Sequence, residues 1–309
     1  MFDVEVTIIV ETFNLGEGSF QPTLRRTLVA ANRIAAERDG TEVLLADCSP
    51  AQDVGLQVAS GLTHVRVIDC ARQSYDESKA TAIARSRGRF IVFLDGDCVP
   101  AKPGWLDAHL RTMRALHGRV ASFGFTQYER SFFQDILSIL DFGFLQGESG
   151  DTCGCYACNN VAFPREVLEA CPLPVTSMRC SCYLHGQQLE RGGMPGRLTR
   201  EAHVLHEPKP FWKERLRRGY DHVAAHWDDG GPDSQVLRYG LAATPLFYLR
   251  ELRMDYRRLR RGWRQFGLTR SAAIAAALIL PVVRFADVPG IAFALAIPPR
   301  RRTGVPAAT

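Results

Sequence analysis

The stretch Gly88-Arg89-Phe90-Ile91-Val92-Phe93-Leu94-Asp95-Gly96-Asp97 decides the fold class of this 309-residue chain. Its first part is an apolar run, as expected of a strand that is buried on both faces of a sheet. The run then passes through an Asp-Gly turn with a carboxylate on either side of the glycine. Because ligands of an open parallel sheet bind beyond the carboxyl ends of its strands, we expect Asp95 and Asp97 to lie at a binding site.

These two carboxylates can converge on one hard cation, because they are two residues apart on a turn. Mg²⁺ and Mn²⁺ prefer such oxygen ligands and keep open positions for the phosphates of a substrate. The competing interpretation is an ordinary solvated Asp-Gly turn. The surrounding sequence has to separate the two interpretations.

The residues around this stretch alternate between strand and helix patterns, which predicts an α/β fold with a mostly parallel sheet flanked by helices. The predicted strands are 6–10, 42–46, 65–68, 89–94 and 119–128, and the predicted helices are 22–38, 75–87, 164–171 and 183–191, with a helix or long aromatic segment at 131–146. We expect a catalytic domain over 1–210, with a nucleotide-binding half (1–118) and an acceptor half (119–210), followed by a helical region over 211–309.

The last hundred residues are basic and apolar. Seven arginines lie between Arg250 and Arg264 in a predicted helix over 245–267, and residues 271–297 are largely apolar. The uninterrupted apolar run covers only 272–283, whereas a spanning helix needs roughly twenty residues. We therefore expect a buried or interfacial segment, and peripheral association with an anionic membrane is favoured over a solvated helix. A basic helix also suits nucleic acid, but nothing else in the chain supports that partner.

Six motifs occur in a recognisable order. They are Val6-Thr7-Ile8-Ile9-Val10-Glu11-Thr12-Phe13-Asn14, Leu44-Leu45-Ala46-Asp47, Lys79, Gly88–Asp97 with Pro103-Gly104-Trp105-Leu106, Asn159-Asn160-Val161-Ala162-Phe163 with Arg165-Glu166, and Ala202-His203-Val204-Leu205-His206. In this order and spacing they resemble the family 2 glycosyltransferases, which have a GT-A fold. The resemblance covers roughly residues 4–210, and residues 88–97 are its most specific part. Glu11 departs from the pattern, because many members have proline there.

The resemblance implies roles for individual residues. Nucleotide contacts are implied for Glu11, Thr12, Asn14, Asp47, Lys79 and Asp95, and metal or phosphate contacts for Asp95, Asp97 and His206. Each position keeps a simpler alternative. Glu11 and Asp47 could cap the turns that follow their strands, Asn14 could shape its turn, Lys79 could be a solvated helix residue, and His206 could be a surface histidine.

The family implies metal-dependent transfer of a sugar, with inversion, from a nucleotide-diphospho-sugar to a glycan, lipid or other acceptor. A UDP-sugar is the favoured donor and Mg²⁺ or Mn²⁺ the implied metal. The alternative is a degenerate transferase that binds a sugar nucleotide or acts as a scaffold. A nucleotidyltransferase-like enzyme is a weaker option, because residues 11–20 lack a glycine-rich loop.

The residue that should take the proton of the acceptor is missing from its expected place. Most members carry an acidic pair at the start of a helix. The helix is recognisable here from Gln187–Gly193, and counting back from it puts the pair near Ser181-Cys182. The stretch 179–185 contains no carboxylate. The alternatives are Asp151 or Glu148 from the preceding loop, His185, or no transfer of the usual kind.

The chain has nine cysteines. Residues 153–158 and 180–185 share a C-x-C-x-x-C/H spacing that could hold structural Zn²⁺, although small buried thiols are the favoured interpretation. No basic stretch and no apolar segment precede the first predicted strand, so no secretory signal is expected. We therefore expect reduced thiols and a cytoplasmic protein at the inner face of the cell membrane. The sequence carries no signal for an oligomeric state.

Overall fold

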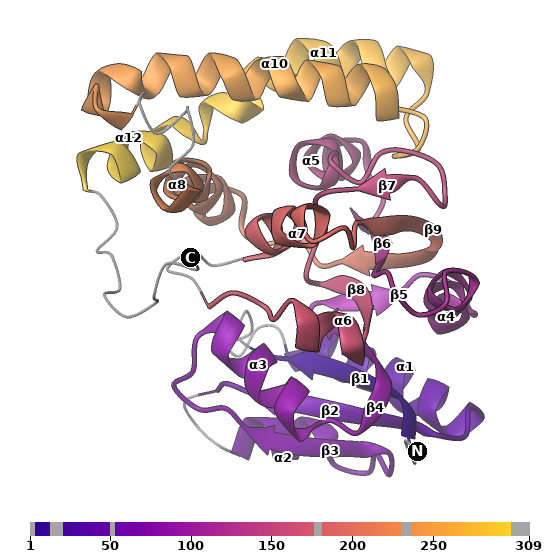
Figure 1. Cartoon of the computed structure of the whole chain (residues 1–309). Helices are drawn as coiled ribbons and strands as arrows, with labels where there is room; N and C mark the ends of the chain where they lie inside the picture. Colours follow the sequence, from indigo (N-terminus) through magenta and orange to yellow (C-terminus); the bar gives the residue numbers. More distant parts are fainter. Residues whose placement is uncertain (1–3, 13–20, 50–52, 176–180, 230–236, 298–309) are drawn as a thin grey trace. The chain divides into compact units, whose positions relative to one another are not determined.

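The computed structural model describes residues 4–12, 21–49, 53–175, 181–229 and 237–297 (Figure 1). The chain divides into two compact units. The first, here the sheet unit, comprises 1–134, 144–175 and 180–207, and the second, the helical unit, comprises the remaining residues. Most of the predicted segment 131–146 therefore belongs to the helical unit, although the sequence placed that segment in the catalytic domain.

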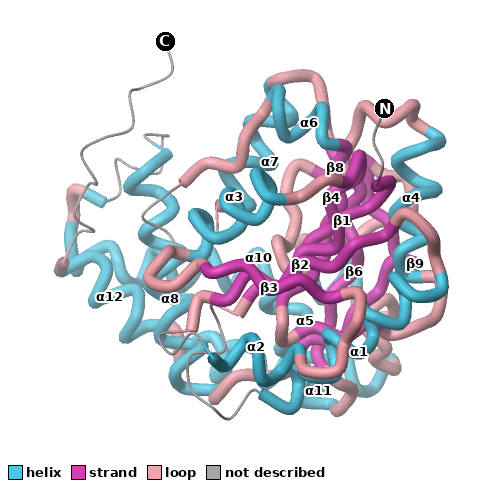
Figure 2. The backbone as a smooth tube through the Cα atoms, turned by 90° about the horizontal axis from the view of Figure 1, so that it is seen from below, coloured by secondary structure: helices cyan, strands magenta, loops and turns pink. Residues whose placement is uncertain are grey.

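The sheet unit is built on one sheet, whose strands are magenta in Figure 2. Over the described residues its strand order is β3-β2-β1-β4-β8-β6-β9-β5, with β7 paired to β9. The strands are β1 (Val4–Glu11), β2 (Thr41–Asp47), β3 (Val65–Asp69), β4 (Gly88–Asp95), β5 (Cys98–Pro100), β6 (Ser122–Tyr128), β7 (Thr152–Cys153), β8 (Asn160–Pro164) and β9 (Gly196–His206).

The first four strands are parallel, as predicted, and their carboxyl ends are in register. Glu11 of β1 lies opposite Asp95 of β4 and Ala46 of β2, and Asp47 lies opposite Asp69 of β3. Four acidic strand ends therefore meet at one edge of the sheet, which is the edge where ligands of parallel sheets bind.

Helices cover both faces of this sheet. Side chains of α1 (Gln21–Glu37), α2 (Asp53–Ala59) and α4 (Trp105–Ala115) pack into the core on one face. Side chains of α3 (Tyr75–Arg85), α6 (Arg165–Ala170) and α7 (Cys182–Arg191) pack into the core on the other. Successive side chains of β1 point to opposite faces of the sheet, so Ile8 packs into the first core and Ile9 into the second.

The second half of the sheet is mixed, which the sequence did not predict. Strand β8 runs antiparallel to β4, β6 is antiparallel to β8, and β9 is parallel to β6. The short strand β5 closes the path antiparallel to β9 and places Cys98 opposite His206. Residues a hundred positions apart are brought together in this way.

The helical unit contains most of α5 (Phe132–Phe142), together with α8 (Phe211–Asp229), the 3₁₀ turn η3 (Gly240–Ala243), α10 (Thr244–Gly262), α11 (Arg270–Phe285) and α12 (Val288–Ala296). Helices α8 and α12 approach very closely, because Gly219 and Gly290 have no side chains. A Cβ atom on Gly219 would lie 2.0 Å from the backbone oxygen of Asp287.

Charged residues are buried inside this unit. Arg284, which interrupts the apolar run in the sequence, pairs with both oxygens of Asp255 at 2.7–2.8 Å and with Asp287 at 2.6 Å. Arg215 pairs with Asp141 at 2.5–2.6 Å. Buried charges are tolerated only when paired, so Arg284 and Asp287 belong to the core of this unit.

Within the described residues, the segment Arg270–Ala296 is long and apolar enough to cross a membrane by length and composition, with a mean hydropathy of 1.8 over its best window. It is longer than the twelve-residue run seen in the sequence, because α11 and α12 follow one another closely. A single segment of this kind is weak evidence, since core helices of soluble proteins pass the same test.

Candidate active site

The turn after β4 is anchored to its neighbours by backbone hydrogen bonds. The backbone N–H of Asp95 donates to the carbonyl oxygen of Asn159 at 3.2 Å, and that of Gly96 donates to Glu11 at 3.1 Å. The side chains of Asp95, Asp97 and Glu11 are all buried. The turn is therefore not the solvated Asp-Gly turn that was the alternative interpretation.

Asp95 is held by two side chains from α3. The Nζ atom of Lys79 lies 2.8 Å from Oδ1 of Asp95, and the hydroxyl of Tyr75 donates to Oδ2 at 2.9 Å. Only 1% of the Lys79 side chain and 5% of that of Asp95 are exposed. The ammonium also lies 4.4 Å from the centre of the Tyr75 ring.

The electrostatics of this site keep the ammonium of Lys79 charged. Burial alone would lower the pKa of Lys79, but the carboxylates of Asp95 and Glu11 raise it above its ordinary value. Burial, followed by the charge of Asp95, raises the pKa of Tyr75, so its hydroxyl stays a donor. Lys79 was predicted from the resemblance as a nucleotide or phosphate contact, and it is instead the buried counter-ion of Asp95.

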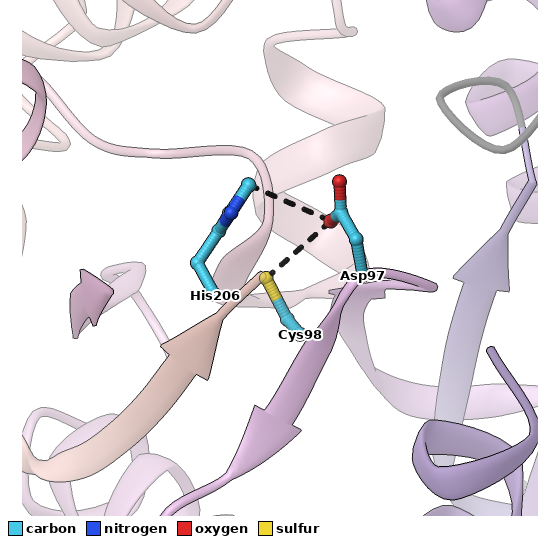
Figure 3. A group of neighbouring side chains, drawn as sticks. All are labelled: Asp97, Cys98 and His206. Carbon is cyan, nitrogen blue, oxygen red and sulfur yellow. Dashed lines mark hydrogen bonds and ion pairs between the residues drawn. The ribbon is translucent and has the colours of Figure 1, made fainter. Parts of the chain in front are cut away.

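Asp97 lies in a different cluster, with Cys98 and His206 (Figure 3). Its Oδ1 atom is 3.6 Å from Nε2 of His206 and 3.7 Å from Sγ of Cys98. The three possible ligand atoms all lie within 4.8 Å of one another. Asp97 and His206 are thus brought together as the resemblance implied, whereas Asp95, also expected as a ligand, is outside this cluster.

The tautomer of His206 suits a ligand. Its Nδ1 atom lies 2.7 Å from the carbonyl oxygen of Glu207, so we assign the proton to Nδ1. The lone pair of Nε2 then faces Asp97. A ring that donates through its second nitrogen to a carbonyl is the usual support of a metal-binding histidine. One oxygen, one nitrogen and one sulfur on converging side chains fit a divalent cation.

Asp47 is buried at the end of β2 and accepts several hydrogen bonds. Its donors include the hydroxyl of Thr12 at 3.2 Å and the backbone N–H of Ser49 at 2.9 Å and of Gly55 at 2.8 Å. A Cβ on Gly55 would lie 2.2 Å from Oδ2 of Asp47, so this approach requires glycine. Asp47 therefore does cap the turn after its strand, which was its simpler alternative.

Asp47 also lines a small pocket, together with Leu56, Val67 and Asp69. Leu56 is 62% exposed and gives the pocket an apolar wall. A nucleotide contact and the capping of the turn are therefore compatible for Asp47. Asn14, the other turn residue named from the resemblance, lies outside the described residues.

Of the loop carboxylates proposed as bases, Asp151 lies far from the metal-ligand cluster. Thr152, which follows Asp151, pairs with Arg197 of β9, and Arg197 lies opposite Ser122 of β6. His206 lies opposite Tyr128, six residues further along β6, which is about 20 Å at the rise of a strand. Asp151 lies level with Ser122, and it is tied to Glu148 by a hydrogen bond of 2.9 Å from the Glu148 backbone to its Oδ2. The structure does not bring Asp151 to Asp97, and Glu148 lies beside Ser149, which is bonded to Arg200 and Glu201 in the middle of β9.

His185 is buried, and both of its ring nitrogens are engaged. Nδ1 lies 2.5 Å from the hydroxyl of Tyr156, and Nε2 lies 2.8 Å from the carbonyl oxygen of Cys171. Burial lowers its pKa. This environment indicates a core histidine rather than a base that faces an acceptor.

The start of α7, where the sequence lacks an acidic pair, receives a carboxylate from another helix. The hydroxyl of Ser181, the residue before α7, donates to Oδ1 of Asp76 at 2.9 Å. Asp76 lies in the first turn of α3, next to Tyr75, which binds Asp95. No sequence pattern identified Asp76, because its partner is more than a hundred residues away.

The described cysteines of the predicted zinc motifs, Cys153, Cys155, Cys158 and Cys182, do not form a ligand group. Among the described residues, the one group of three or more potential metal ligands is Asp97, Cys98 and His206. The thiol of Cys153 instead donates to the backbone oxygen of Cys155. Of the described cysteines, seven are free and Cys182 is disulfide-bonded, which differs from the expectation of reduced thiols throughout.

Comparison with known proteins identifies the family. The model of glycosyl transferase family 2 matches residues 7–171, which is more than half of the chain and includes Asp47, Lys79, Asp95 and Asp97. The chain belongs to glycosyl transferase family 2. The sequence-based assignment is thereby confirmed, and the protein is a glycosyltransferase. None of the curated proteins compared with it matches the chain.

Solved structures agree with this family 2 assignment at the level of the fold. A mannosyltransferase from Pyrobaculum calidifontis, solved with GDP-Man and Mn²⁺, matches with a TM-score of 0.59 and 18% identity, over 96% of this chain and 89% of that one. GalNAc-T7, solved with UDP, GalNAc and Mn²⁺, matches with a TM-score of 0.51 and 11% identity, over 67% of this chain but only 44% of the other. The predicted GT-A type of α/β fold is confirmed.

Proposed function

We propose that this family 2 enzyme transfers a sugar, with inversion, from a nucleotide-diphospho-sugar to a glycan, lipid or other acceptor in a reaction that requires Mg²⁺ or Mn²⁺. A UDP-sugar is the favoured donor. The observation that carries the proposal is the convergence of Asp97 and His206 at the binding edge of the parallel strands. The metal-bound nucleotide sugars in the two similar structures support the same assignment.

Each residue of the donor side has a distinct task in this proposal. Asp97 and His206 hold the cation, which neutralises charge on the departing diphosphate. Asp47 and Leu56 bind the base in the pocket that they line. Thr12, whose hydroxyl contacts Asp47, keeps that carboxylate oriented. Lys79 holds the carboxylate of Asp95 in place at the strand end, where Asp95 can accept hydrogen bonds from the donor.

The acceptor side requires a group that takes a proton. In a direct displacement the acceptor oxygen bonds to the sugar carbon, the diphosphate leaves, and the acceptor proton passes to a base. We assign this role to Asp76, in place of Asp151, Glu148 and His185. Support comes from its hydrogen bond to Ser181 at the start of α7 and from its position next to Tyr75.

Turnover of sugar nucleotides tests the proposed function. UDP-, GDP- and dTDP-sugars are incubated with the protein with and without Mn²⁺, and release of the nucleoside diphosphate is measured with and without a panel of glycan and lipid acceptors. We expect metal-dependent release with one nucleotide class and loss of that release in Asp97→Asn. Metal-independent turnover, or full turnover in Asp97→Asn, would refute the assignment.

One observation keeps the alternative of a degenerate, sugar-nucleotide-binding protein in view. The start of α7 carries no carboxylate of its own, and the carboxylate that contacts Ser181 is supplied by Asp76 of α3. Under this alternative, calorimetry would show tight metal-dependent binding of a sugar nucleotide. No acceptor in the panel would stimulate release of the nucleoside diphosphate. Turnover separates the two, because only a transferase releases the nucleoside diphosphate in the presence of an acceptor, and only a transferase loses that release in Asp76→Asn.

We also propose that the helical unit binds the cytoplasmic face of an anionic membrane. Four apolar side chains of α11, Ile274, Leu278, Val282 and Phe285, are each more than 60% exposed. Their spacing of four, four and three residues puts them on one side of the helix. Such a stripe suits insertion into the interfacial region of a bilayer.

The neighbouring helix supplies the matching charge. Tyr248 and Tyr256 of α10 donate to the backbone oxygens of Pro281 and Ala277, so α10 lies alongside α11. The exposed arginines of α10 and its surroundings are Arg253, Arg257, Arg260, Arg261, Arg264 and Arg270. An apolar stripe beside a basic helix favours anionic lipid as the occupant of this surface.

A further inference from the structure

Cys98 is part of the metal-ligand cluster, although neither the motif nor the family assignment points to it. It lies directly opposite His206 in the antiparallel pair of β5 and β9. Side chains of such pairs share one face, with Cβ atoms about 4.5–5.5 Å apart. Because Cys98 also follows Asp97 in the chain, the sheet fixes all three side chains around one point (Figure 3).

The simplest explanation of Cys98 is a small apolar core residue. It is fully buried and packs with Ala202 and Val204, which agrees with that explanation. Its sulfur, however, makes a polar contact, because the thiol donates to Oδ1 of Asp97 at 3.7 Å. An apolar packing role does not require the sulfur to face a carboxylate and an imidazole.

The backbone around Cys98 is anchored on two sides. The hydroxyl of Thr27 on α1 is 2.9 Å from the carbonyl oxygen of Cys98 and 3.1 Å from that of Gly96. The backbone N–H of Glu207 donates to Asp97 at 2.8 Å on the other side. The turn is thus tied to α1 and to the end of β9, so the backbone of Cys98 cannot move away from Asp97 without breaking these bonds.

We propose that the thiolate of Cys98 is a third protein ligand beside Asp97 and His206, and that it makes the centre select Mn²⁺ and the later first-row metals over Mg²⁺. The inference rests on the proposed metal-dependent function. When a cation binds, the sulfur–metal bond replaces the S–H bond and the proton passes to solvent. No oxidant or further reactant is involved.

The selectivity follows from ligand chemistry. Mg²⁺ prefers oxygen ligands and gives up its water reluctantly. Thiolate and imidazole are softer ligands, and affinity for such sets rises from Mn²⁺ towards Co²⁺ and Zn²⁺. A centre that keeps Asp97 and His206 but has an oxygen in place of the sulfur would discriminate less, so Cys98 strengthens the preference.

Binding of Co²⁺ alone, followed by absorption spectroscopy, tests this inference without any substrate. Coordination of thiolate to Co²⁺ produces a charge-transfer band in the near ultraviolet. We expect the band in the wild-type protein, its loss in Cys98→Ser, and its retention in Cys171→Ser, a matched variant outside the cluster. Removal of an outer-shell partner already costs about 10–100-fold in metal affinity, so Cys98→Ser should lose at least that for Co²⁺.

The outcomes separate this inference from the proposed function. Co²⁺ that binds by calorimetry without the band, or with a band that survives in Cys98→Ser, would overturn the role of Cys98 and leave the metal site intact. A protein that binds neither Co²⁺ nor Mn²⁺ would overturn the proposed function and this inference together. Competition of Mn²⁺ with Mg²⁺ gives a second readout, and the preference for Mn²⁺ should shrink in Cys98→Asp.

Discussion

Asp95 and Asp97 are two residues apart in the chain, yet their side chains have different partners. Asp95 is paired with Lys79 and Tyr75 inside the core, whereas Asp97 faces His206 and Cys98. The sequence motif predicted that both acids lie at a site. The motif could not predict that the two carboxylates have different partners, because the residues that contact them come from α3, β5 and β9.

The Lys79–Asp95 pair gives the first prediction. Replacement of Lys79 by Met leaves a buried carboxylate without its counter-ion, so we expect a loss of about 3–5 kcal/mol in the free energy of unfolding. Denaturant titration measures this. The double variant Lys79→Met/Asp95→Asn should recover much of the loss, because no buried charge remains. A single variant as stable as the wild type would show that the pair is not buried as described.

Asp76 gives a prediction about the reaction. If Asp76 takes the acceptor proton, Asp76→Asn should lower kcat of transfer by about 10²–10⁴-fold while KM for the donor and its metal-dependent binding stay near wild type. Asp151→Asn is the matched control and should keep full activity, because Asp151 lies about 20 Å along the sheet from the metal-ligand cluster. Unchanged kcat in Asp76→Asn would assign the base to another residue.

At the scale of elements, the parallel strands β1 to β4 and the helices α1, α3 and α7 follow the predictions from hydrophobic periodicity. Periodicity is a local signal, and these elements are long enough to show it. Strand β5 has three residues and exists only through its pairing with β9, so no local pattern could reveal it. The metal-ligand cluster depends on that pairing, and the ligand Cys98 was missed for the same reason.

Asn160 is a second residue whose role could not be predicted from a local sequence pattern. The resemblance assigned its segment to the acceptor side, but Asn160 is buried and joins elements of the core. Its amide donates to the carbonyl oxygens of Phe125 and Ala202, and its oxygen accepts from Trp105. A Cβ on Gly124 would collide with this side chain. The role of Asn160 in the described structure is to hold α4 on the sheet.

His109 of α4 belongs to this network and predicts a pH dependence. Its ring nitrogens lie 2.8 Å from Ser122 and 3.1 Å from Asn160, and burial lowers its pKa to about 4. The folded state therefore binds the proton less well than the unfolded state, whose histidine titrates near 6.5. The contribution of His109 is fully present above pH 6.5 and is lost as the pH falls towards 4, by roughly 1.4 kcal/mol per pH unit.

Denaturant titrations at pH 7 and pH 4.5 measure this effect. The wild-type protein should lose stability between the two values, and His109→Gln should lose less, since glutamine has no proton to bind. Carboxylates contribute to both proteins and cancel in the difference. An equal pH dependence of the two proteins would refute the assignment of a neutral, buried His109.

At the scale of the whole chain, exposed apolar side chains are concentrated in the helical unit. Leu278 and Val282 are 76% and 73% exposed, more than any other large apolar residue described. The sequence showed that 271–297 is apolar, but not which residues face solvent. Which side of α11 faces solvent follows from Arg284 and Asp287, which are paired inside the unit. The opposite side of α11 is therefore exposed.

Vesicle binding tests the membrane proposal. The double variant Leu278→Ser/Val282→Ser should bind vesicles that contain phosphatidylserine more weakly than wild type, because buried apolar area drives insertion. High salt should also weaken binding, through the arginines of α10. Leu56→Ser, which removes an exposed leucine from the sheet unit, is the matched control and should bind as wild type. Equal vesicle binding by the wild type and both variants would refute the proposal that the exposed side of α11 binds the membrane.

The central claim is that Asp97 and His206 hold a cation on a sugar-nucleotide diphosphate. Its most direct test is the thermal midpoint of wild type, Asp97→Asn and the surface control Asp39→Asn with UDP-, GDP- and dTDP-sugars, with and without Mn²⁺. A ligand at a hundredfold excess over its Kd stabilises the folded state by about 2.7 kcal/mol. We expect such an increase for wild type and Asp39→Asn with one nucleotide class, only when Mn²⁺ is present, and none for Asp97→Asn. An equal increase in Asp97→Asn, or one that does not depend on Mn²⁺, would contradict the claim.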